Sequence, residues 1–297
     1  HRDLHSFPTR RSSDLTAWDT GKKRFFQLYP NARFATDDPL HWTGRYQNWN
    51  AMCADCHSTA LKKNYDPAAG TYRTTWSEIN VGCEGCHGPG EAHVAWARGS
   101  REARTQTPTG GLVVQLKTAD ARAEVEACAA CHSRRTPLNV DDRPGQSFLD
   151  RYRPELLRAG RYHADGQQLD EVYVYGSFLQ SKMYGHGVRC SDCHEPHSLK
   201  LRAEGNDLCT RCHQPRPDTR FPSLAAKDYD TPSHHFHKSG SAGAACVNCH
   251  MPAKTYMVVQ SRPDHSIRIP RPDLSERIGT PNACNQCHAN RAPRGAA

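Results

Sequence analysis

The chain has 297 residues, a formal net charge of +8 and a mean hydropathy of −0.81. Only 36% of its residues are hydrophobic, too few for the ordinary apolar core of a protein of this length. It contains no apolar run long enough to span a membrane and no long Lys/Arg run that would favour binding to nucleic acid.

The first 15 residues, HRDLHSFPTRRSSDL, are charged and contain no apolar segment of the kind found in secretion signals. The run also resembles a translation of sequencing-adaptor DNA. We therefore interpret residues 1–15 as a non-native leader and base no functional prediction on them.

Seven copies of the motif Cys-x-x-Cys-His follow, and together they contain all 14 cysteines of the chain. A c-type haem is bound by this pattern, because two thiols add to the porphyrin vinyl groups and the next His ligates the iron. On one helical turn, positions i, i+3 and i+4 share a face, so all three side chains reach one flat ring. The motifs predict seven covalent haem c groups, attached through Cys53, Cys56, Cys83, Cys86, Cys128, Cys131, Cys190, Cys193, Cys209, Cys212, Cys246, Cys249, Cys284 and Cys287. The predicted proximal iron ligands are His57, His87, His132, His194, His213, His250 and His288.

Other uses of paired cysteines fit the pattern poorly. A structural zinc site takes four ligands, usually from two pairs, and seven pairs cannot be divided in that way. Neither zinc, nor a disulfide framework, nor a redox dithiol explains a His directly after every second Cys.

Haem also explains the shortage of apolar residues, since each macrocycle supplies an apolar disc around which the chain can wrap. We expect a mainly α fold with extensive loops, a haem-filled interior and little or no sheet. Of the 39 basic residues, 29 are Arg, and the planar guanidinium suits bidentate pairing with haem propionates.

Local patterns predict a few short elements in chain order. Residues 91–104 and 119–132 have helical periodicity. The alternating run 171–180 indicates either a short strand or extended backbone against a haem edge. Near the end, Thr280 is a natural N-cap and Pro281 suits the first helical position, so the last motif is expected at a helix N-terminus.

The spacing of the motifs suggests two modules. Successive first cysteines are 30, 45, 62, 19, 37 and 38 residues apart, and the longest gap contains the loop-like stretch RRTPLNVDDRPGQ. We expect an N-terminal three-haem module at 16–137 and a C-terminal four-haem module at 138–297. The fourth and fifth motifs are nearest in sequence, so their haems should be neighbours.

Histidines outside the motifs could supply the second axial ligands. Eleven such His exist, and nine remain for seven irons once His1 and His5 are set aside, so we expect mostly low-potential haems with two His ligands. Of the three His in the SHHFH run, only one or two should ligate, and His41 is the least suited by position. The distal candidates are His93, His163, His186, His197, His234 and His265.

Longer strings carry a family resemblance. WTGRYQNWNAMCADCHSTAL, CEGCHGPGEAHVAW, YVYGSFLQSKMYGHGVRCSDCHEPHSLKL, CVNCHMPAKTYMVV and DHSIRIPRPDLSERIGTPNACNQCH are similar to multihaem cytochromes of the cytochrome c554 class. The nearer branch is periplasmic, has a doubled Cys-x-x-Cys-His module and is often followed by tetratricopeptide repeats, which we expect to be missing after ANRAPRGAA. The resemblance implies distal ligands at His93, His163, His197 and His265. The absence of Cys-x-x-Cys-Lys argues against a pentahaem nitrite reductase.

Three functions are compatible with these motifs. The leading one is a periplasmic, or otherwise extracytoplasmic, heptahaem carrier that passes electrons between redox proteins such as other cytochromes, a quinol-linked donor or a terminal reductase. The alternative is an enzyme acting on a small nitrogen or sulfur compound, of the nitrite or hydroxylamine type, at an open haem. If His41 does not ligate, a haem of the first module would be the candidate for this open site. A filament subunit that donates a His to its neighbour's haem is the third.

Overall fold

The computed structural model describes residues 16–139 and 144–296, so the expected leader at 1–15 lies outside the described residues. The chain forms two compact units. Unit 1 runs to Pro154 and includes Met257–Val259, and unit 2 contains Glu155–Tyr256 and Gln260 onward. The first three motifs lie in unit 1 and the other four in unit 2, while the haem content of each module stays a prediction.

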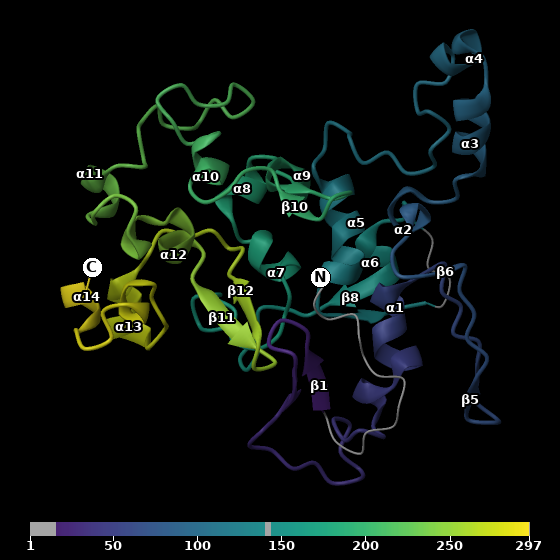
Figure 1. Cartoon of the computed structure of the whole chain (residues 1–297), viewed down its shortest axis with the longest axis horizontal. Helices are drawn as coiled ribbons and strands as arrows, with labels where there is room; N and C mark the ends of the chain where they lie inside the picture. The colour runs from purple at the N-terminus through teal and green to yellow at the C-terminus, as the bar shows by residue number, and fades with distance from the viewer. Residues whose placement is uncertain (1–15, 140–143, 297) are drawn as a thin grey trace. The chain divides into compact units, whose positions relative to one another are not determined.

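Unit 1 is made of short elements joined by loops (Figure 1). Its elements are β1 Thr16–Asp19, β2 Arg24–Gln27, η1 Arg45–Gln47, η2 Trp49–Cys53, α1 Ala54–His57, β3 Ser58–Thr59, β4 Tyr65–Asp66, β5 Thr71–Tyr72, β6 Glu78–Ile79, α2 Cys83–His87, α3 Glu91–Arg98, α4 Arg101–Thr105, α5 Arg122–His132, β7 Arg135–Pro137, α6 Phe148–Arg151 and β8 Tyr152–Pro154.

Unit 2 is built in the same way. It contains α7 Tyr175–Phe178, α8 Lys182–Gly185, α9 Cys190–Cys193, β9 His194–Glu195, β10 Lys200–Leu201, α10 Asp207–Thr210, α11 Pro232–His235, η3 Ala242–Ala244, α12 Cys246–His250, β11 Ala253–Tyr256, β12 Gln260–Pro263, α13 Pro272–Ile278, η4 Cys284–Gln286 and α14 Pro293–Ala296.

The expectation of a mainly α fold with little or no sheet is wrong. The chain is 31% helical and 15% strand, and its described residues form six two-stranded antiparallel sheets. The reason is that most motif helices last about one turn, after which the chain folds back through a short ladder. Ser58–Thr59, for example, directly follows α1 and pairs with Glu78–Ile79. Ladders of two to four residues contain too few alternating positions to be recognised in the sequence.

Two of the local predictions are confirmed, with small changes of boundary. The helical run 91–104 is divided into α3 and α4 at Gly99, where the chain becomes extended, and the second run forms α5. In Figure 1 the pair α3–α4 projects away from α5 and α6. Val125 and Ala129 of α5 are buried, and the Glu126 carboxylate accepts a hydrogen bond of 2.8 Å from the Phe148 backbone N–H at the start of α6.

Of the two other local predictions, one is wrong and one is right only in part. Residues 171–180 contain the one-turn helix α7 rather than a strand or an extended run, and Phe178 of this helix is buried. The last motif does begin a helical turn, the 3₁₀ helix η4, but the N-cap is Ala283 rather than Thr280, whose buried hydroxyl has no hydrogen-bond partner among the described residues. Pro281 fixes only its own backbone angle, which is not enough to set the start of a helix three residues later.

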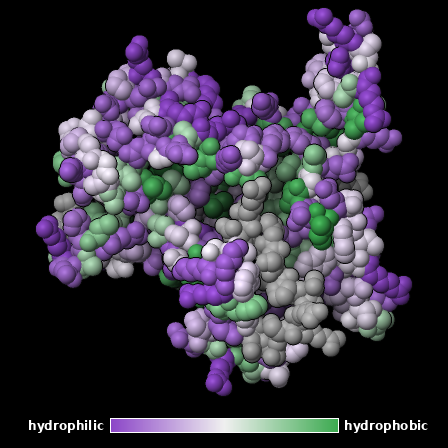
Figure 2. All heavy atoms as spheres, in the orientation of Figure 1, coloured by the Kyte–Doolittle hydropathy of each residue, from purple (hydrophilic) through white to green (hydrophobic). Residues whose placement is uncertain are grey.

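Apolar side chains are distributed differently from those of an ordinary globular protein. In the described part of the chain, 15 hydrophobic residues are buried while 24 large hydrophobic residues are exposed. Figure 2 shows these apolar side chains in scattered patches among hydrophilic ones. The chain alone therefore provides a small core, and its remaining apolar surface is available to cover another apolar group.

Candidate functional site

The seven motifs occupy short helical turns. The first spans η2 and α1, the second forms α2, the third ends α5, the fourth begins α9, the fifth ends α10, the sixth forms α12 and the last begins η4. None of the 14 cysteines, all of which lie in the described part of the chain, forms a disulfide, so both sulfurs of every motif can form thioethers. In α2 and α12 the helix includes both cysteines and the following His, the one-turn arrangement that a single porphyrin requires.

In unit 1 the thiols of different motifs lie next to one another. Cys56 Sγ is 3.8 Å from the Cys131 carbonyl oxygen, and the two thiols also share a hydrogen bond that lowers the pKa of Cys56 and raises that of Cys131. Cys86 is close enough to Cys128 for their charges to interact, although burial is the main reason why the pKa of Cys86 is raised. The third motif therefore lies beside both the first and the second.

In unit 2 the thiols follow one another from motif to motif. Neighbouring pairs are Cys193 with Cys212, Cys209 with Cys246, and Cys249 with Cys284. The middle pair shares a hydrogen bond, which lowers the pKa of Cys246 to about 7 and raises that of Cys209. The four motifs of this unit thus form a continuous series in space.

Three motif histidines of unit 2 face a second His from outside the motifs. The ring centroids are 6.4 Å apart for His194 and His265, 6.2 Å for His234 and His250, and 6.0 Å for His237 and His288. Two imidazoles on one iron should be separated by about 6 Å, given metal–nitrogen bonds of about 2 Å and roughly 1.1 Å from each nitrogen to its ring centre. The three separations fit an iron held between the two rings.

The protonation of these rings also suits ligation. Nδ1–H of His250 donates to the Arg268 carbonyl oxygen at 2.9 Å, and Nδ1–H of His265 donates to that of Pro263 at 3.0 Å. The Nδ1–H of His237 donates to the His235 carbonyl oxygen. Such bonds fix the tautomer and leave the Nε2 lone pair free for a metal. Burial lowers the pKa of His194 and of His265, which favours the neutral form that ligates.

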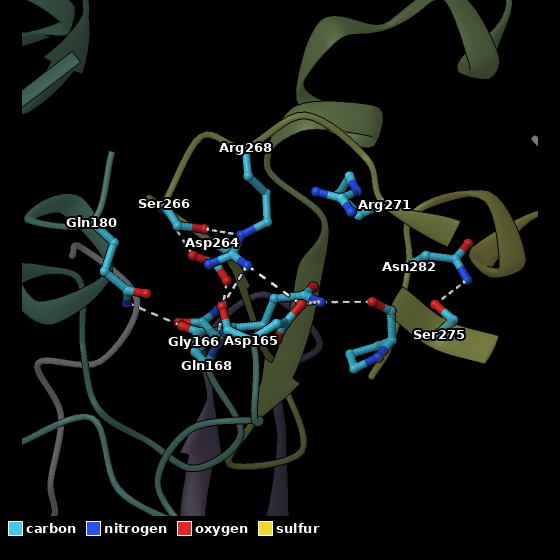
Figure 3. Close-up of polar contacts among 12 residues, drawn as sticks. Asp165, Gly166, Gln168, Gln180, Asp264, Ser266, Arg268, Arg271, Ser275 and Asn282 are labelled. Atoms are coloured by element: carbon cyan, nitrogen blue, oxygen red, sulfur yellow. Dashed lines mark hydrogen bonds and ion pairs between the residues drawn. The ribbon is translucent and has the colours of Figure 1, made fainter. Parts of the chain in front are cut away.

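A buried polar network holds the loop that carries His265 (Figure 3). Asp264, 2% exposed, accepts hydrogen bonds from the backbone N–H groups of Ser266 at 2.8 Å and Gln168 at 3.3 Å. The Arg268 guanidinium donates to the Ser266 hydroxyl at 2.8 Å and to the Asp165 carbonyl oxygen at 3.0 Å. The ring of His265 is therefore positioned by contacts on both sides of it in the sequence.

For His93, His163 and His186, the ring contacts described within each unit include no motif His, and the contact described for His197 is with Glu195. His93 on α3 donates from Nδ1 to the Gly110 carbonyl oxygen at 2.7 Å, which leaves its Nε2 free. His163 is half-buried, and desolvation lowers its pKa. His186 caps the end of α8, and His197, whose side chain is 79% exposed, lies 3.1 Å from the Glu195 carboxylate. Their assignments remain predictions.

His237 is the residue that the sequence did not single out. Within SHHFH, His234 lies on α11, which ends at Phe236 in the left-handed region with φ 58°, so the chain turns before His237. The two His therefore contact different motifs. A left-handed Phe is uncommon and leaves no signal in the sequence, so the separate destinations could not have been predicted.

Other features of the chain fit a haem with its propionates. Among the described residues, three buried nitrogen atoms that could matter here have no hydrogen-bond partner: Nη2 of Arg135, Nε2 of His235 and Nη1 of Arg262. The side chain of Arg135 is only 6% exposed. Buried donors of this kind need an acceptor, which a carboxylate provides. Among residues 16–139 and 144–296, no group of three or more His, Cys, Asp or Glu is placed to hold a bare metal ion.

Comparisons with known proteins agree with this site. Residues 15–88 match the family model "Cytochrome c554 and c-prime", and residues 184–217 match "Doubled CXXCH motif". The fold is similar to that of the outer cell wall cytochrome OcwA, with a TM-score of 0.59 and 19% identity over 97% of this chain and 69% of OcwA. An undecahaem cytochrome from the S-layer of Carboxydothermus ferrireducens gives a TM-score of 0.41 and 19% identity over 92% of this chain and 47% of its own. Among curated proteins, none matches this chain in sequence.

The two family segments and the motifs agree on the cofactor. Cys-x-x-Cys-His in a cytochrome c family indicates covalently bound haem c, while the number of haems and the tetratricopeptide repeats stay predictions. In the described part of the chain, every helix is too short or too polar to cross a bilayer. These findings identify a cytochrome c554 segment at residues 15–88 and a doubled CXXCH motif at residues 184–217, in a chain whose seven motifs are those of a multihaem c-type cytochrome.

Proposed function

We propose that this cytochrome binds seven haem c groups and carries electrons between redox proteins in the periplasm or elsewhere outside the cytoplasm. Bound haem supplies the reversible one-electron chemistry of iron. The chain contributes the thioether links, the axial imidazoles and the spacing between neighbouring sites.

The contact between motif thiols carries this proposal. Each thioether sulfur is bonded to a porphyrin edge, so Cys209 beside Cys246 implies that the edges of the fifth and sixth haems are close. Cys56 beside Cys131 implies the same for the first and third. Rings this close suit transfer from haem to haem through each unit.

The partners would be other cytochromes, a quinol-linked donor or a terminal reductase. The excess of Arg over Lys supports neutralisation of the propionates, so the net charge of +8 need not reflect binding to nucleic acid. Extracytoplasmic location is supported by the chemistry of haem attachment and by the outer-wall origin stated in the name of the structurally similar OcwA.

The test is to make the chain in a host that attaches c-type haem and to measure intact mass and pyridine haemochrome. We expect seven haem increments and complete, reversible reduction with low-spin spectra for most irons. Fewer than seven increments would contradict the haem count. Haems that cannot exchange electrons with a donor cytochrome would contradict the carrier role.

A further inference from the structure

The fifth motif differs from the other three motifs of unit 2. His194, His250 and His288 each face a second imidazole at 6.0–6.4 Å. Among the described residues of unit 2, the ring in contact with His213 is instead Tyr229, with centroids 5.8 Å apart and planes at 84°.

Tyr229 is too close to His213 to be the second ligand of its iron. A phenolate ligand opposite an imidazole would place the two ring centres about 7 Å apart, because the phenol oxygen and both metal bonds lie between them. Tyr229 also contacts His234 edge-on at 5.0 Å. It therefore lies beside the His213 imidazole, between the fifth and sixth motifs, and not across an iron from His213.

The three histidines of the nearby SHHFH run are engaged elsewhere. His234 faces His250 and His237 faces His288. His235 accepts a hydrogen bond at Nδ1 from the His237 backbone N–H at 3.1 Å, so the proton of the neutral ring is on Nε2 and no ring lone pair is left for a metal. The SHHFH run thus supplies two ligands, and neither faces His213.

We propose that the haem attached through Cys209 and Cys212 has one protein ligand, His213, and binds a small exogenous molecule at its other axial position. The ligand class is a diatomic or small nitrogen donor that can approach the half-exposed fifth motif, with carbon monoxide as the probe. This inference rests on the proposed haem attachment. It places a ligand-binding iron within the series of four motifs, next to a sixth site that has two imidazoles.

The experiment counts the carbon monoxide bound per chain by the fully reduced, full-length holoprotein and by two variants. His250→Ala removes one of two imidazoles from the sixth haem, so it should raise the count by one. His213→Ala should not raise the count, because that iron already has an open axial position before the change. The Fe–C stretching frequency of one adduct should shift, since the ligand opposite carbon monoxide is lost.

Two results would overturn the inference: no carbon monoxide uptake by the unaltered protein, or a count that rises by one in His213→Ala as it does in His250→Ala. The unaltered protein alone supplies the first of these, so the test does not depend on the variants folding. Intact mass is measured for each sample, because missing haem would contradict the proposed function, whereas haem that is attached but closed to carbon monoxide contradicts only this inference.

Discussion

Single side chains decide how many protein ligands each iron has. His234 and His235 are neighbours on one helical turn, yet only His234 faces a motif His in the described structure. The difference follows from the turn at Phe236 and from the Nδ1 hydrogen bond of His235. The roles of these two adjacent histidines can therefore be distinguished by changing each of them alone.

The first prediction concerns this pair. His234→Ala should open the iron of His250 and add one equivalent of carbon monoxide binding to the reduced protein, because one of two axial imidazoles is lost. His235→Ala is the matched control and should add none. Visible spectra under carbon monoxide check both, and equal uptake by the two variants would contradict the assignment of His234.

The second prediction concerns Asp264. Asp264→Ala removes the acceptor of two buried backbone N–H groups and should lower the free energy of unfolding by about 1–3 kcal/mol. It should also broaden the low-spin electron paramagnetic resonance signal of the haem ligated by His265. Asp273→Ala, which breaks an exposed pair with Arg271, is the control and should change neither. If the free energy of unfolding fell while the signal stayed normal, Asp264 would stabilise the fold without positioning His265.

Helices and turns place the motif side chains, and here the sequence was informative in part. The one-turn geometry of the motifs and the helices at 91–104 and 119–132 could be predicted, because both rest on local periodicity. The short ladders could not, since Ser58 and Thr59 pair with residues 21 and 19 positions away and only two residues on each side take part. The His pairs were predictable in kind from the surplus of His. Their partners depend on long loops that have no periodicity.

The third prediction concerns the end of α2. Gly88 directly follows proximal His87 and has φ 74° and ψ −173°, a conformation that is essentially restricted to glycine. Gly88→Ala should therefore lower the free energy of unfolding by about 1–3 kcal/mol, and its Cβ would also come within 3.3 Å of Val113 Cβ. Gly185→Ala, where nothing lies within 4 Å of the added Cβ, is the control. Chemical denaturation of the two variants measures the difference.

At the scale of the whole chain, the buried hydrophobic residues are few and small. Among the 15 found in residues 16–139 and 144–296, six are alanine, and the largest fully buried side chain there is that of Phe148. A chain of 297 residues with such a core has little to offset the conformational entropy of folding. The attached haems should therefore supply most of the interior.

The fourth prediction follows from this. Chain produced without haem attachment should have little fixed structure, with weak far-ultraviolet circular dichroism, no cooperative thermal transition and rapid digestion by protease. The holoprotein, treated identically, should unfold cooperatively and resist digestion. A cooperative transition in the haem-free chain would show that the polypeptide interior is sufficient by itself.

The reversal at Phe236 has a consequence for how this cytochrome can vary. His234 and His237 are three residues apart, on either side of the bend at Phe236, and they face different motif histidines, His250 and His288. An insertion or deletion in this segment would shift both imidazoles at once, so its length is constrained from two directions. Changes in loop length should therefore be tolerated more readily elsewhere in unit 2 than in this segment.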